Sequence, residues 1–326
     1  MRARSDVAAL AGACLCLSFL GACERVVPIE VPAESPRLVV EGRIESPRNG
    51  APDIPRIRIS TTQPYFEDRP ATPVTGAVVL LRDGTGPPIL LVAGAAGEYV
   101  GAPLTVVPDR VYSLEISWGG EEFVAVDTAA DVAPIDSLYF TPLAASPNER
   151  LATLSFRDVP GRPDRYLWDQ WVDGVRLRGP TASLRFRPIA SDIGIEGSAV
   201  SGFAPFHSVA IPLGATVRVR QQGISRTTFD FFVMLNDQLA RDGWPFSQLP
   251  ASVKGNVRAR TTPARRPSGY FSVGRYDERT LVRTRCAPTA SGRRATGDPT
   301  PRHDERFPDA AVRPRSRGTP PRSRAG

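Results

Sequence analysis

The stretch YSLEISWGGEEFVAV, residues 112–126, decides the fold class of this chain. Apolar side chains at Tyr112, Leu114 and Ile116 alternate with small polar or acidic ones, a pattern that is typical of a strand with one buried and one solvated face. The two glycines in the middle provide a two-residue turn, and an apolar strand follows them. The stretch therefore predicts an antiparallel β-hairpin in a β-rich protein.

Short strands of the same kind precede this hairpin. Leu38–Val40, Ala77–Leu81 and Ile89–Val92 are short apolar runs separated by turn residues, at the spacing found in β-sandwiches. We therefore expect a first β-sandwich domain over residues 37–130, of the immunoglobulin-like or prealbumin-like kind.

A second β-rich domain is expected over residues 131–286. Here Tyr166–Val172 meets Val175–Arg178 across an Asp-Gly pair, which is a strong hairpin signal. The apolar period then changes to that of a helix near residues 228–241, and we expect this helix to pack on the second sandwich. The predicted fold class is mainly β, with two tandem β-sandwich domains and one helix.

The first 23 residues have the features of a lipoprotein signal peptide. Two arginines precede the apolar run Val7–Leu20, which is shorter than the roughly 20 residues that a spanning helix needs. Leu20-Gly21-Ala22-Cys23 closes the run and resembles a bacterial lipobox. We expect removal of residues 1–22, lipidation of Cys23 and a linker over residues 23–36. The alternatives are an ordinary secretory signal with a chance cysteine and an uncleaved anchor, which the short length of the run disfavours.

The four cysteines agree with this interpretation. Cys14 and Cys16 leave with the signal peptide, and Cys23 is used by the lipid. Only Cys286 remains, so the mature chain is expected to have no intramolecular disulfide. The folded body must then be stable through burial alone, and it is long enough for that.

The formal net charge of +7 gives a misleading picture of the body of the chain. Residues 287–326 contain nine arginines against four acidic residues, and the signal peptide is also basic. The rest is close to neutral, which predicts no basic face and excludes nucleic acid as a partner. The tail over 287–326 is rich in arginine and proline without apolar periodicity, so we expect it to be disordered.

Few residues suggest catalysis. The only histidines are His207 and His303, which excludes a histidine-based triad and a multi-histidine metal site. No phosphate-cradling or dinucleotide motif is present, and the aspartates do not match the spacing of a calcium loop. We expect no metal and no cofactor. A hydrolase with two carboxylates that converge in space remains an alternative.

An aromatic run in the second domain offers the best candidate binding residues. In Tyr166-Leu167-Trp168-Asp169-Gln170-Trp171, the period of a strand places Trp168 and Trp171 on opposite faces. One of them could stack on a ligand or bury in a partner. The alternative is that the predicted helix covers the second face.

Several short motifs also occur in a characteristic order. They are Leu38-Val39-Val40-Glu41-Gly42, Ala77-Val78-Val79-Leu80, Gly97-Glu98-Tyr99, Tyr112-Ser113-Leu114, Asp136-Ser137-Leu138, Phe156-Arg157-Asp158, Trp244-Pro245-Phe246, Lys254-Gly255-Asn256 and Gly269-Tyr270-Phe271-Ser272. Together with the lipobox, this order resembles the lipoproteins of domain-of-unknown-function family 4249.

The resemblance implies a cell-envelope lipoprotein of a family without an established activity. Such proteins are often associated with TonB-dependent outer-membrane transporters. We therefore expect a non-enzymatic, lipid-anchored protein of the outer membrane, facing the periplasm or the cell surface, that binds a ligand or a transporter. The alternatives are a carboxylate-dependent envelope hydrolase and a purely structural envelope protein.

Overall fold

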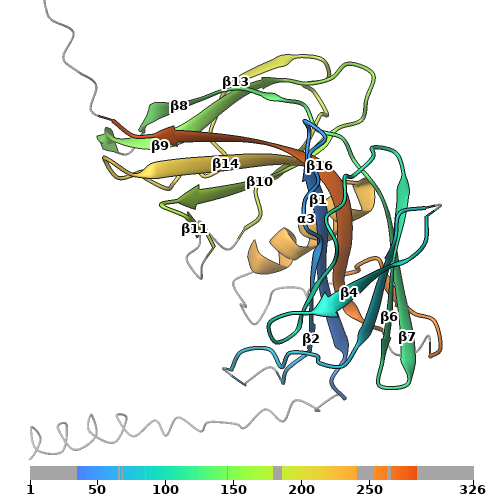
Figure 1. Ribbon diagram of the computed structural model, residues 1–326. Coiled ribbons are helices and arrows are strands. Elements are labelled where there is room, and N and C mark those ends of the chain that lie inside the picture. Colours follow the sequence, from blue (N-terminus) through green and yellow to red (C-terminus); the bar gives the residue numbers. More distant parts are fainter. Residues whose placement is uncertain are drawn as a thin grey trace, which may run out of the picture. The chain divides into compact units, whose positions relative to one another are not determined.

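A computed structural model of the chain describes residues 35–64, 67, 69–84, 86–144, 146–178, 186–240, 253–262 and 266–284. Strands dominate this part of the chain (Figure 1), so the mainly β fold class is confirmed. The expected signal peptide, Cys23, Cys286 and the tail over 287–326 lie outside the described residues.

The described strands form one long sheet and one small sheet. In chain order the strands are β1 (Leu38–Pro47), β2 (Arg56–Thr61), β3 (Val78–Arg82), β4 (Ile89–Ala93), β5 (Glu98–Val100), β6 (Val111–Trp118), β7 (Glu121–Thr128), β8 (Ile135–Leu143), β9 (Ser146–Arg157), β10 (Arg165–Val172), β11 (Val175–Arg176), β12 (Ile189–Ser191), β13 (Ala199–Phe203), β14 (Thr216–Gly223), β15 (Val257–Ala259) and β16 (Ser268–Val282). The long sheet has the order β11-β10-β14-β16-β1-β2-β5-β4-β3-β6-β7-β15, with β12 paired to β10, and the small sheet has the order β13-β9-β8.

The first core lies between two parts of the long sheet, strands β1, β2 and β16 on one side and strands β3, β6 and β7 on the other. Strands β1 and β2 contribute Val40 and Ile57, and β6 contributes Leu114 and Ile116, all of them buried. The predicted hairpin is β6 paired with β7, and both turn glycines have positive φ angles of 59° and 76°. That prediction is confirmed, because only a primed turn matches the twist of the two strands.

The second core lies between the small sheet and strands β10 and β14. Leu154 and Phe156 of β9 pack against Tyr166 and Trp168 of β10 in one buried cluster. The predicted Asp-Gly hairpin joins β10 to β11. Its turn residues both have positive φ angles, 48° and 81°, so this prediction is also confirmed.

Strand β16 belongs to both parts of the long sheet. Its first nine residues pair in parallel with β1, from Ser268 to Tyr276. From Tyr276 to Val282 it pairs antiparallel with β14, and Figure 1 shows it extending from one group of strands to the other. The division at residue 130 stays a prediction, and the structure adds that residues 268–276 lie beside β1.

The helix α3 (Arg226–Ala240) begins two residues before its predicted start. Ser225 caps it, because its hydroxyl oxygen accepts a hydrogen bond of 3.2 Å from the backbone N–H of Thr228. Phe231 and Phe232 of its buried face pack against Tyr270. Leu167 of β10 and Ile189 of β12 belong to the same apolar cluster, so the expected helix packs on strands of the predicted second domain. Within the described residues, no helix is long and apolar enough to cross a membrane.

Two glycines allow the chain to cross itself closely beside α3. A Cβ atom on Gly255 would lie 1.6 Å from the carbonyl oxygen of Gly269, and one on Gly269 would lie 1.9 Å from that of Val40. Asn256 stabilises this crossing, because its side-chain amide donates hydrogen bonds to the backbone carbonyls of Val126 and Phe271 at 3.0 and 2.7 Å. Three of the short sequence motifs, those that begin at Leu38, Lys254 and Gly269, therefore meet in space to join β7, β16 and β1.

A buried carboxylate lies at the junction of β7, β16 and the start of α3. Asp127 accepts a hydrogen bond of 2.8 Å from the backbone N–H of Val273. Burial raises the pKa of Asp127 to about 6, although hydrogen bonds from Ser225, Val273 and Thr228 oppose the shift. The charged form is therefore destabilised in the folded protein near neutral pH.

We expect Gly269→Ala to destabilise the fold by about 3 kcal/mol or more, because it combines a left-handed backbone with a clash against a carbonyl. Gly120→Ala is the matched control, since Gly120 also has a positive φ but has open space around it. It should cost only about 1 kcal/mol. Urea unfolding of both variants measures the difference, and equal losses would show that the crossing is not tight.

We expect the stability of the protein to fall as the pH rises through the pKa of Asp127 at about 6. A raised folded-state pKa stabilises the protein below the unfolded-state pKa of about 3.9, and that contribution is lost at higher pH. Asp127→Asn should remove this loss and gain up to about 3 kcal/mol at neutral pH relative to the wild type. Unfolding titrations at several pH values test this, with the exposed Asp136→Asn as a control that keeps the wild-type profile.

Candidate functional site

A groove opens between α3 and the face of the long sheet opposite the first core. It encloses about 790 Å³, a volume within the usual range of ligand sites. Residues of β1, β2 and β16 form its floor, and Phe231 and Leu235 of α3 form one wall. A smaller hollow of about 260 Å³ lies beside it and shares Arg43 and Arg56 with it.

The alternation of β1 places charged side chains in this groove. Val40 and Ile44 point into the first core, so Glu41 and Arg43 must point to the opposite face. The register between β1 and β2 sets Arg43 beside Arg56. One strand therefore supplies both core residues and groove residues.

Three arginines surround the buried carboxylate of Asp169 on β10; we call these four residues the arginine cluster. Arg43 Nη1 lies 2.9 Å from Asp169 Oδ2, and Arg176 Nε lies 2.9 Å from Oδ1. Arg187 Nη1 lies 3.9 Å from Oδ1. The three arginines come from three separate segments of the chain, so the cluster exists only in the folded protein.

The charges in this cluster outweigh the effect of burial. Burial alone would raise the pKa of Asp169, but the charges of Arg43 and Arg176 hold it well below its usual range. Burial would likewise lower the pKa of Arg43, but Glu45 and Asp169 raise it instead. Asp169 and Arg43 are therefore both ionised at neutral pH.

Trp171 lies next to the cluster on the same face of the sheet. It is half-buried beneath the guanidinium group of Arg218, which lies 4.0 Å from the ring centroid. Trp168 points the other way, is 1% exposed and donates a hydrogen bond of 2.9 Å to Gln221. The predicted opposition of the two tryptophans is confirmed, and Trp168 is a core residue rather than an accessible stacking surface.

The helix covers only part of the face that Trp171 shares. Leu167, two strand positions before Asp169, packs in a cluster with Phe231 and Phe232 of α3. Trp171 instead lines the smaller hollow with Arg176 and Arg220. Trp171 therefore remains a candidate binding residue, and the structure does not bring Trp168 to the same site.

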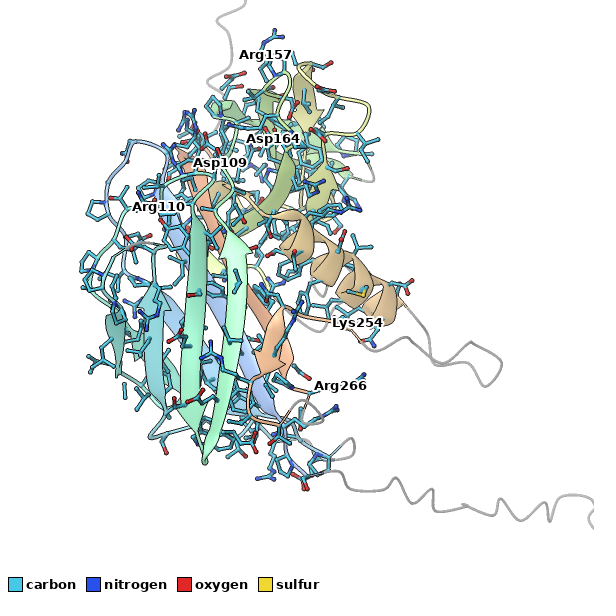
Figure 2. The ribbon with its side chains drawn as sticks, turned by 90° about the vertical axis from the view of Figure 1, so that its right-hand side faces the viewer. Asp109, Arg110, Arg157, Asp164, Lys254 and Arg266 are labelled. Carbon is cyan, nitrogen blue, oxygen red and sulfur yellow. The ribbon has the colours of Figure 1, made fainter. Side chains whose placement is uncertain are left out.

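The buried carboxylates of the second core form a separate network. The hydroxyl of Tyr166 donates to Asp158 and, at 3.0 Å, to Asp164. Arg162 binds Asp164 through two hydrogen bonds of 2.6 and 2.9 Å. Figure 2 shows Asp164 well away from Lys254, the residue that follows the groove residue Val253. These carboxylates are engaged inside the fold and do not line the groove.

Other reactive groups are sparse. His207 lies on an exposed turn. In the part of the chain that the structure describes, no three His, Cys, Asp or Glu residues are grouped to hold a metal ion.

The arginines of the groove were missed from the sequence. The near-neutral charge of the body predicted no basic face, and net charge does not describe where the charges of a folded chain gather. Five arginines line the groove, namely Arg43, Arg56, Arg58, Arg178 and Arg187, against two glutamates, Glu41 and Glu98. One local signal was available, since Glu41, Arg43 and Glu45 alternate with apolar residues along β1.

We expect Asp169→Asn to destabilise the protein by about 3 kcal/mol, because it removes the buried carboxylate that three arginines share. The matched control is Asp230→Asn on α3, which breaks an exposed pair with Arg226 at 3.6 Å and should cost less than about 0.5 kcal/mol. Chemical unfolding measures both. Equal effects would mean that the arginines are already compensated by solvent or other acids.

Comparison with known proteins places the chain in a family. A solved structure of α-L-rhamnosidase from Dictyoglumus thermophilum aligns with a TM-score of 0.19 and 11% identity, covering 58% of this chain and 27% of that one. That likeness is too weak to carry an argument. No curated protein matches the chain. The model of the family described as "Domain of unknown function (DUF4249)" matches residues 24–280, so the chain belongs to the DUF4249 family.

Proposed function

We propose that this protein is a non-enzymatic lipoprotein of the outer membrane that is anchored through Cys23 and binds a ligand in the groove. The groove carries the proposal, because it is a concave site of ligand size built mainly on a packed sheet and helix. A site on such elements holds its side chains in fixed positions before a ligand arrives.

The proposed anchor lies close to the groove along the chain. The family match begins at residue 24, directly after the cysteine that the lipobox would place first in the mature chain. The linker over residues 23–36 leads into β1, the strand that carries Glu41 and Arg43. Fully extended, it reaches at most about 50 Å. A lipid at Cys23 would therefore keep the groove near the membrane surface.

The composition of the groove supports a binding role. Its charged residues are arginines and glutamates, several of them held in ion pairs such as Arg43 with Asp169 and Arg56 with Glu98. Among the described lining residues there is no histidine or cysteine to act as a base or nucleophile.

A TonB-dependent outer-membrane transporter is the partner that we propose, on the basis of the family resemblance. A binding protein tethered near such a transporter would raise the local concentration of its ligand. Affinity purification of the acylated chain from its own membrane tests this part. Recovery without any outer-membrane partner would count against the accessory role.

We expect the expressed protein to incorporate labelled palmitate and to sediment with membranes. Cys23→Ala should abolish both, since only a thiol at this position can carry the lipid. Cys286→Ala is the matched control and should keep the label and the membrane fraction. Persistent labelling of Cys23→Ala would overturn the proposed anchor.

A further inference from the structure

Among the described residues, arginines outnumber carboxylates in the lining of the groove. Arg43, Arg176 and Arg187 share the carboxylate of Asp169, and of these three only Arg43 has a second carboxylate partner, Glu45, among the described residues. Arg178 also lines the groove, and among the described residues it has neither a hydrogen bond nor an ion pair. Desolvation and the charge of Arg187 lower the pKa of Arg178 to about 10. Around Arg43, Arg176, Arg178 and Arg187 the described carboxylates are therefore fewer than the guanidinium groups.

The same region is short of hydrogen-bond acceptors. Arg43 Nη2 donates to the side-chain oxygen of Gln222. The Nε atom of Arg43 and the amide nitrogen of Gln222 are buried, and neither has a partner among the described residues. Buried donors without acceptors are unfavourable. An oxyanion in the groove would relieve the shortage of negative charge around these guanidinium groups.

An apolar wall stands beside these donors. Phe231 and Leu235 of α3 line the groove together with Val253 and Tyr270. The rings of Phe231 and Tyr270 lie 4.9 Å apart, which makes a continuous aromatic surface. A ligand that fills the groove therefore meets guanidinium groups at one part and apolar side chains at another.

We propose that the groove binds an organic oxyanion, a carboxylate or phosphate joined to an apolar body, with Arg178 and Arg187 contacting the oxyanion and Phe231, Leu235 and Tyr270 packing on the body. Planar guanidinium groups match both carboxylate and phosphate oxygens through paired hydrogen bonds. This inference rests on the proposed ligand-binding function and specifies its chemistry. Arg178 is the residue available for the ligand, because no hydrogen bond or ion pair joins it to another described residue.

Calorimetric titration of the whole acylated chain in a nonionic detergent tests the proposal. The probes are 2-naphthoate, 2-naphthyl phosphate and the neutral 2-naphthylmethanol, each also titrated into detergent alone. We expect at least one anion to bind at one site per chain, at least about tenfold tighter than the alcohol. The two anions separate a carboxylate site from a phosphate site, and raising the salt concentration should weaken either one.

Variants locate the binding site. Arg178→Gln should weaken the anion about tenfold or more and leave the alcohol unchanged, and Arg187→Gln should act in the same direction. Arg157→Gln is the matched control: its exposed side chain lies on β9, on the part of the protein away from Lys254 in Figure 2. Thermal unfolding of each variant checks that the fold is kept.

Three results would overturn the inference: no binding of either anion, equal binding of the alcohol, or an equal loss with Arg157→Gln. These results are separate from those of the lipid-labelling experiment. A chain that takes no palmitate but binds the anion refutes the anchor alone. A chain that is labelled and binds no anion refutes the groove chemistry alone.

Discussion

Strand β16 pairs in parallel with β1 over its first half and antiparallel with β14 over its second half, and the rest of the structure depends on this double pairing. It makes one sheet from segments that are distant in sequence. Because β10 pairs with β14, the carboxylate of Asp169 is brought to Arg43 on β1. Without β16 between them, the two strands would share no face and the arginine cluster would not form.

The cluster has an energetic cost that the fold must offset. Buried ion pairs contribute little net stability, because the desolvation of each charge opposes the attraction between them. Here two carboxylates, Asp169 and Glu45, lie within ion-pair distance of three arginines, so negative charge is still in the minority. An arrangement selected only for stability would be better served by apolar side chains of similar volume. This imbalance is the basis on which we propose an anion for the groove.

The local features of the fold were predictable from the sequence, and the distant contacts were not. The hairpin at Gly119-Gly120 and the helix over Arg226–Ala240 follow from residues close in sequence. The pairing of β1 with β16 joins residues more than two hundred positions apart, and no alternation pattern specifies such a partner. For the same reason the sequence predicted that Trp171 lies on the opposite face of its strand from Trp168, but it did not predict that Arg218 of β14 lies over the ring of Trp171.

The short motifs that suggested the family have a structural explanation that differs from a binding role. Gly255 and Gly269 permit a close backbone crossing, and Asn256 fastens it with hydrogen bonds to two strands. These residues determine how closely β1, β7 and β16 approach one another. Arg178 and Arg187 lie outside every motif that carried the resemblance. Membership of the DUF4249 family therefore describes the scaffold, whereas the ligand has to be inferred from the groove residues of this chain.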